Sequence, residues 1–157
     1  MNTYEIGAVA RVTTRFYFAT VLVGAISSTA TTLVVASAAG FPGSGSFPIH
    51  IDAEDMLVTS GQGTTTWVVT RGTGIMAPVQ HADGSTVTTP GDPTAVTLTA
   101  LREDGTTTSP AAVRDALGVW HGDFTIDRSG RWGGKTVGTG ALPAVARWEF
   151  FVNPQEV

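Results

Sequence analysis

The most constraining feature of the sequence is a β-strand pattern that breaks off and resumes far along the chain. Residues 4–18 alternate between two faces as a half-buried strand does, and the pattern returns at residues 92–99. Because the ends of a compact domain often lie close together, a second domain can be inserted at an exposed loop. We therefore expect a β-sandwich of residues 1–18 and 90–157, interrupted by a small β-module of residues 19–89.

The composition favours strands and turns. Only 14% of the residues are charged and 42% are hydrophobic, which is too apolar for a disordered chain. The 19 glycines and 8 prolines, together with abundant threonine, disfavour long helices. The predicted fold class is all-β, and the one short segment with some helical character is residues 111–115.

The inserted segment contains several short strands separated by turns. The pattern places them at residues 21–26, 32–35, 47–51, 56–59, 65–69 and 86–88. An acidic turn of residues 52–55 joins two of them as a hairpin, and residues 40–45 form a glycine-rich loop. Strands this short are best accommodated in a small barrel or sandwich that closes on itself.

Alternation also predicts which side chains face inward. One face of the first strand carries Ala10, Val12, Thr14, Phe16 and Phe18. Three tryptophans lie at inward positions of other strands: Trp67, Trp120 and Trp148. Trp132 is expected either in the core or at an interface. Phe151 breaks the alternation of the last strand, so we expect it to contact another subunit.

The charge pattern argues against nucleic acid as a specific partner. The net charge is −4, and the nine lysines and arginines are scattered, whereas nucleic-acid binding needs a basic surface. The chain has no cysteine, which fits folding in a reducing cytoplasm. Two domains this small have limited cores and no disulfide to compensate, so we expect an oligomer.

One segment imitates a secretion signal. Arg11 and Arg15 precede an apolar run at residues 16–25, and small residues follow at 36–39. Against a signal, Glu5 lies in the basic region and hydroxyl residues interrupt the apolar run at residues 27–32. The same interruption argues against a membrane-spanning helix, so we expect neither secretion nor a membrane partner.

No group of side chains in the sequence has the spacing of a catalytic, cofactor or metal site. Asp52, Glu54 and Asp55 form the only acidic cluster, which we interpret as a solvated hairpin turn because its spacing does not fit a calcium loop. The three histidines, His50, His81 and His121, are far apart and are expected at the surface. We therefore predict a protein that is not an enzyme and has no cofactor.

Two sets of segments have a familiar arrangement. The first comprises residues 32–42, 51–59, 81–87 and the stretch Trp67-Val68-Val69-Thr70-Arg71-Gly72. It resembles a small β-module that recurs in structural proteins of tailed bacteriophages. The second comprises residues 92–98, 104–108, 118–124, 130–132 and 138–140. It is similar to immunoglobulin-like proteins encoded among the head–tail joining genes of actinobacterial phages, although Gly133-Gly134 stands where aromatic strand residues are expected.

The resemblance implies an immunoglobulin-like sandwich and a non-enzymatic subunit of the virion, assembled in the host cytoplasm. The leading hypothesis is a head-to-tail connector, a stopper or adaptor that forms a ring of identical copies in the neck. Its neighbours would be the portal or adaptor and the tail terminator or tail tube. The alternatives are a capsid-decorating or tail-surface protein, and a secreted accessory domain of a bacterial enzyme. Candidate interface residues are Phe41, Pro42, Trp132 and Phe151.

Overall fold

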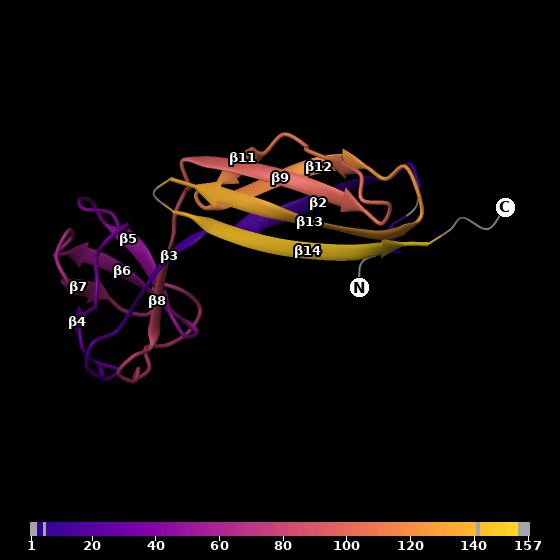
Figure 1. Ribbon diagram of the computed structural model, residues 1–157. Coiled ribbons are helices and arrows are strands. Elements are labelled where there is room, and N and C mark those ends of the chain that lie inside the picture. Colours follow the sequence, from indigo (N-terminus) through magenta and orange to yellow (C-terminus); the bar gives the residue numbers. More distant parts are fainter. Residues whose placement is uncertain (1–2, 5, 141, 154–157) are drawn as a thin grey trace. The chain divides into compact units, whose positions relative to one another are not determined.

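The computed structural model describes residues 3–4, 6–140 and 142–153, and every regular element within them is a β-strand (Figure 1). The predicted all-β class is confirmed. None of these residues forms a helix long and apolar enough to cross a membrane. The chain divides into two compact units, one made of residues 1–16 and 92–157 and the other of residues 17–91. The first is called the sandwich below, and the second the barrel.

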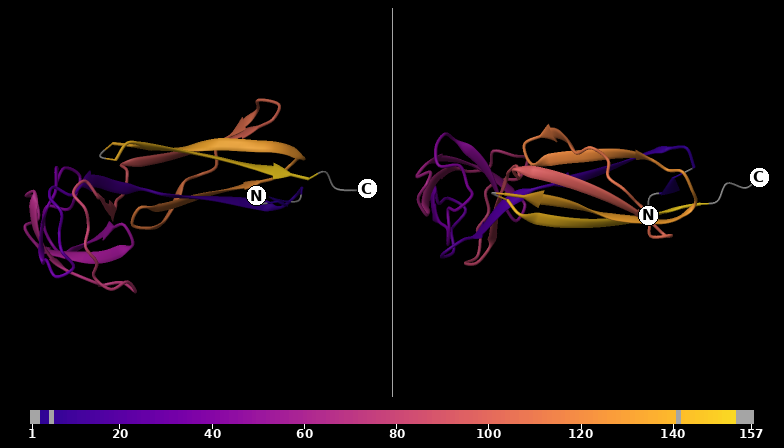
Figure 2. Two further views of the ribbon diagram at one scale, coloured as in Figure 1. Left: turned by 90° about the horizontal axis from the view of Figure 1, so that it is seen from below. Right: turned by 45° about the horizontal axis from the view of Figure 1, so that its top comes forward.

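The sandwich consists of two facing sheets, which the left view of Figure 2 shows as two layers. One sheet has the order β1-β14-β13-β9-β10 and the other the order β11-β12-β2. The strand bounds are β1 Thr3–Tyr4, β2 Val9–Arg15, β9 Ala95–Arg102, β10 Thr107–Thr108, β11 Val113–Ala116, β12 Val119–Thr125, β13 Gly130–Thr139 and β14 Ala144–Val152. All pairs are antiparallel except the short pair β1–β14.

The strand order is that of an immunoglobulin domain. In such a domain strands B, E and D form one sheet, and strands C, F and G form the other. In chain order, β2, β9, β10, β11, β12, β13 and β14 take the places of B, C, C′, D, E, F and G. The barrel is therefore inserted into the connection between strands B and C. The chain departs from antibody domains in lacking the cysteine pair and in carrying Trp132 on the strand at position F.

The two sheets enclose one aromatic core. Phe124, Trp132, Trp148 and Phe150 stack with ring centroids 5.5–6.3 Å apart. The predicted inward face of the first strand is confirmed for Ala10, Thr14 and Phe16, because Ala10 is fully buried and the other two nearly so. The buried hydroxyls of Thr14 on β2 and Thr136 on β13 lie 2.9 Å apart and form a hydrogen bond between the sheets.

Residues 17–91 form a six-stranded sheet that closes on itself. Its order is β3-β8-β5-β6-β7-β4, with β3 Tyr17–Val21, β4 Thr32–Val34, β5 Phe47–Ile51, β6 Glu54–Ser60, β7 Thr66–Thr70 and β8 Thr86–Pro90. The first and last strands meet through a bridge between Leu22 and Val35 and through the hydrogen bond from Val23 N to Val34 O, 2.8 Å. The predicted closed β-module is therefore a small barrel, and closure leaves no long strand edge open.

The barrel has a separate aromatic core. Trp67 is fully buried, and its ring lies 5.1 Å from that of Phe41 and 5.5 Å from that of Phe47. The Trp67 indole N–H donates to the carbonyl oxygen of Thr64 at 2.7 Å, so the burial leaves no polar atom of this side chain unpaired. Leucine, isoleucine, valine and methionine side chains complete this core: Leu22, Leu33, Val35, Ile49, Ile51, Met56, Val58, Val69 and Val87.

Several sequence-based boundaries differ from the structure. Tyr17 and Phe18 begin a barrel strand, and the Phe18 ring packs 6.3 Å from that of Phe41 rather than in the sandwich. Pro90 likewise ends a barrel strand, paired with Tyr17. The helical character assigned to residues 111–115 was wrong, because β11 begins at Val113 and pairs with β12.

Candidate functional site

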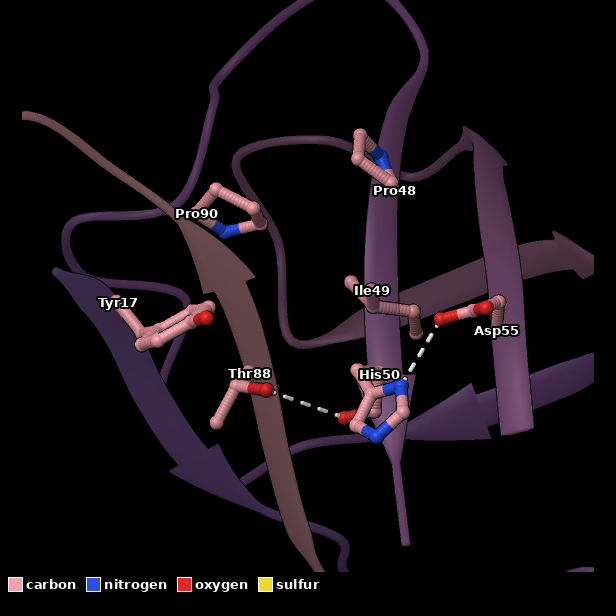
Figure 3. A pocket seen from close by; sticks show the side chains of 7 residues that line it. All are labelled: Tyr17, Pro48, Ile49, His50, Asp55, Thr88 and Pro90. Carbon is pink, nitrogen blue, oxygen red and sulfur yellow. Dashed lines mark hydrogen bonds and ion pairs between the residues drawn. The ribbon is translucent and has the colours of Figure 1, made fainter. Parts of the chain in front are cut away.

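One candidate binding surface is a hollow of about 400 Å³ on the outside of the barrel (Figure 3). We call it the tyrosine hollow. Strands β3, β5, β6 and β8 supply its lining residues, which are Tyr17, Pro48, Ile49, His50, Asp55, Thr88 and Pro90. Its wall is mostly apolar, with one ionisable pair. An apolar surface with a few polar groups is typical of a binding site.

The ionisable pair of the tyrosine hollow is His50 and Asp55. His50 Nδ1 lies 2.9 Å from Asp55 Oδ1, and both side chains are about half exposed. In Figure 3 the Thr88 hydroxyl points to the backbone carbonyl oxygen of His50, 3.5 Å away, rather than to the imidazole. A carboxylate and an imidazole become a hydrolytic site only with a nucleophile beside the second ring nitrogen. The Thr88 hydroxyl bonds the backbone in this structure and does not face the imidazole.

A second cluster of charges is buried inside the barrel. Glu54 is fully buried, and the guanidinium of Arg71 donates two hydrogen bonds to its carboxylate, at 2.8 and 2.7 Å. The backbone N–H groups of Gly72 and Val79 donate to the same carboxylate at 3.2 and 3.0 Å. The hydrogen bond of Arg71 first, and after it those of the Val79 N–H and of His81, hold the pKa of Glu54 at about 2 against the opposing effect of burial.

His81 completes this buried network. Its Nε2 lies 3.0 Å from Glu54 Oε2, and its Nδ1 lies 2.7 Å from Asp52 Oδ2. Because carboxylate oxygens accept and do not donate, both contacts are hydrogen bonds only when both ring nitrogens carry a proton. The sequence-based expectation of a surface position was wrong for His81 and Glu54, which are at most 2% exposed, and for His121 in the sandwich, which is 8% exposed.

The network fastens loops of the barrel. Arg71 Nη1 donates to the backbone carbonyl oxygens of Ser27 and Ala30 at 2.8 and 3.1 Å, and Arg71 Nη2 donates to that of Val79. One side chain thus ties residues 27–30 and 71–79 to strand β6. The sequence contained one signal for it: Glu54 is in phase with the inward-facing Met56 and Val58, where a carboxylate needs a buried partner. His81 follows a loop without periodicity and gave no such signal.

The outer face of the larger sandwich sheet is a second candidate surface, and we call it the cationic face. Lys135 on β13 is directly opposite Arg147 on β14, and both are exposed. Arg131, on the same face of β13, pairs with Glu149 of β14. Like charges opposite each other on adjacent strands destabilise a sheet. Within the described residues neither Lys135 nor Arg147 has an ion pair that would offset this repulsion.

Glycines leave the cationic face hollow at its centre. Gly133 of β13 lies between Leu101 of β9 and Glu149 of β14. Two hollows of about 480 and 370 Å³ lie here, and they share Leu101, Gly134 and Arg147 as lining residues. Exposed apolar side chains lie on the two strands that flank β13: Leu101 on β9, and Val145 and Phe151 on β14. The face therefore combines apolar area with two cations that form no ion pair among the described residues.

The predicted interface residues fall in different environments. Trp132 is fully buried in the sandwich, and Phe41 is 8% exposed in the barrel core, so neither presents a large surface to a partner. Phe151 is 39% exposed on the outer face of β14, and Pro42 is exposed beside Phe41. The structure therefore brings Phe151 to the cationic face, and it leaves Trp132 as a core residue.

Comparison of this chain with known proteins found no relative. No family model, no curated protein and no solved structure matches the chain. In the part of the chain that the structure describes, no group of three or more histidine, aspartate or glutamate side chains is arranged to hold a metal ion.

Proposed function

We propose that this protein is a non-enzymatic structural subunit of a tailed-bacteriophage virion, and that it acts in the neck as a head-to-tail connector. The observation that carries the proposal is the nesting of the two units. One chain builds an immunoglobulin-type sandwich and extends the connection between its B and C strands into a separately closed barrel. Each unit has its own core, as expected of a building block that presents two different surfaces.

The surfaces of the two units support an assembly role. The tyrosine hollow and the cationic face both combine apolar side chains with a few charged ones, which is a combination that protein interfaces use. The buried Glu54–Arg71 pair fastens loops of the barrel to strand β6. The segments that resemble phage proteins lie in both units, residues 32–87 in the barrel and residues 92–140 in the sandwich.

In this role copies of the chain form a closed ring, and the ring contacts the portal or adaptor on one side and the tail terminator or tail tube on the other. Ring symmetry repeats one contact around the axis, so a modest surface on each copy suffices for a stable assembly. The site of action is the virion, assembled in the cytoplasm of the host.

The test is a cryo-electron microscopy reconstruction of purified tailed-phage particles from the source of this sequence. The expected result is density for the nested sandwich and barrel in a symmetric ring between capsid and tail. Many copies over the capsid or tail surface would instead identify a decoration protein. Absence of the chain from purified particles, checked by mass spectrometry, would refute a virion role.

A further inference from the structure

The cationic face contains two cations that form no ion pair among the described residues, beside a hollow that Glu103 and Glu149 also line. Five arginines of the sandwich form ion pairs with a carboxylate: Arg11, Arg102, Arg114, Arg128 and Arg131. Lys135 and Arg147 have no such partner among the described residues, although they face each other across two strands. A repulsive pair beside a hollow indicates a surface whose counter-charge comes from another molecule.

The barrel carries the opposite charge. Arg71 is the only lysine or arginine in residues 17–91. Its side chain is 6% exposed and forms an ion pair with Glu54. Three carboxylates remain at the barrel surface: Asp52, Asp55 and Asp83. Asp55 is 54% exposed and lines the tyrosine hollow, so negative charge and apolar rings occur together there.

We propose that the tyrosine hollow of one copy docks on the cationic face of the next copy, with Asp55 opposite Lys135 and Arg147. The two surfaces are complementary in charge, and each also has exposed apolar area. Tyr17 contributes on the barrel, where it is 44% exposed. Val145 and Phe151 contribute on the sandwich, where they are 60% and 39% exposed.

Such a contact joins two different surfaces, so it is head-to-tail. A head-to-tail contact propagates from copy to copy, and it ends in a closed ring or continues as a filament. The inference rests on the proposed function, because it supplies the self-association that a neck ring requires. It concerns the isolated chain in solution, and it can therefore be tested separately from the location of the protein in a particle.

The experiment is sedimentation velocity of the full chain from about 1 μM to about 1 mM, at low salt and again at about 0.5 M salt. We expect association that grows with concentration and is weakened by salt. The double variant Lys135→Glu/Arg147→Glu should raise the dissociation constant at least tenfold or so, and Asp55→Lys should have a similar effect. Combining all three substitutions should restore most of the association, because the two charges have then been exchanged.

Thr125→Glu provides the control. Thr125 is exposed on β12 of the other sheet and pairs with Val9 at the start of β2, so the substitution adds negative charge to the sandwich without changing the proposed contact. The inference would be overturned if the wild-type chain stays monomeric at every concentration. It would also be overturned if the Lys135→Glu/Arg147→Glu variant has the same dissociation constant as the wild type. A chain that associates as expected but is absent from virions would refute the neck role and leave the docking contact intact.

Discussion

Thr14 and Thr136 form a hydrogen bond between the two sheets of the sandwich, hydroxyl to hydroxyl at 2.9 Å. Thr136 is fully buried and Thr14 is 7% exposed, so neither hydroxyl has water as an easy substitute. The bond joins β2, near the start of the chain, to β13, near its end. The apolar side chains of the sandwich core surround this bond, and each hydroxyl has the other as its hydrogen-bond partner.

Replacing one of these threonines should cost more than replacing both. Thr136→Val leaves the Thr14 hydroxyl buried without a partner, which typically costs about 1–3 kcal/mol. Thr14→Val/Thr136→Val removes both groups and should be close to neutral. Urea unfolding of the two single variants and the double variant measures the coupling. Additive costs in the double variant would contradict the pairing.

The buried pair in the barrel should be sensitive to loss of either member. Arg71→Met leaves the Glu54 carboxylate buried without its main partner, and breaking such a pair typically costs about 3–5 kcal/mol. Hydrogen exchange of peptides from residues 17–91 should show faster opening, whereas peptides from the sandwich should change little. Arg128→Gln, which removes an exposed ion pair with Asp104, is the control and should leave the barrel unaffected.

Acid should weaken the barrel through Glu54. Its pKa is lowered from the usual 4.5 to about 2, so the stabilisation is complete above about pH 4.5 and is lost as the pH falls toward 2. Barrel opening, measured by hydrogen exchange at several pH values, should therefore increase over this range. In Glu54→Gln the dependence should be flatter, since no carboxylate titrates there. An equally steep dependence in that variant would assign the effect to other groups.

Two alanine substitutions distinguish the roles of two predicted interface residues, Trp132 and Phe151. Trp132→Ala removes a fully buried ring that stacks on Phe124 and Phe150, and such truncations cost about 3–5 kcal/mol. Phe151→Ala removes a partly exposed ring and should leave the folding midpoint nearly unchanged while weakening self-association. Thermal unfolding and sedimentation of both variants test this distinction. A stable, well-folded Trp132→Ala chain would contradict the core assignment.

The adjacent glycines Gly133 and Gly134 of β13 should differ sharply in how well they tolerate substitution by alanine. A Cβ at position 134 would overlap the carbonyl oxygen of Thr99 and the ring of Trp148. Gly134→Ala should therefore destabilise the sandwich by about 1–3 kcal/mol. A Cβ at position 133 would be 3.5 Å from the carbonyl oxygen of Trp148, which is ordinary contact, so Gly133→Ala should be neutral or slightly stabilising. Chemical denaturation of the two variants gives the comparison.

Composition was enough to predict the all-β class, and alternation predicted the inward face of β2 and the exposure of Phe151. The last two features depend on local periodicity, which a sequence displays directly. The barrel was predicted only as a closed module, because its closure depends on the bridge between Leu22 and Val35, which the alternation within β3 and β4 does not encode. Gly133-Gly134 suggested a break in pairing, yet β13 is continuous, since β9 and β14 hydrogen-bond it from both sides.

The candidate sites were harder to predict than the fold. The acidic residues at 52–55 were interpreted as a solvated turn, and this holds for Asp52 and Asp55 but not for Glu54. The difference is one of phase: Glu54 begins β6 and points inward, and a buried cation makes its position tolerable. Lys135 and Arg147 lie opposite each other because of the register between β13 and β14, and the spacing of residues in the sequence does not reveal that register.

The pairing of Tyr17 with Pro90 has an evolutionary consequence. Neighbouring strands in a sheet are about 5 Å apart, so the barrel receives the chain and returns it across a single strand spacing. The two ends of the inserted segment are therefore separated by the same short distance whatever domain is folded between them. Recombination can therefore exchange the inserted barrel for another domain with similarly placed ends, and give the protein a new binding surface while the sandwich folds as before.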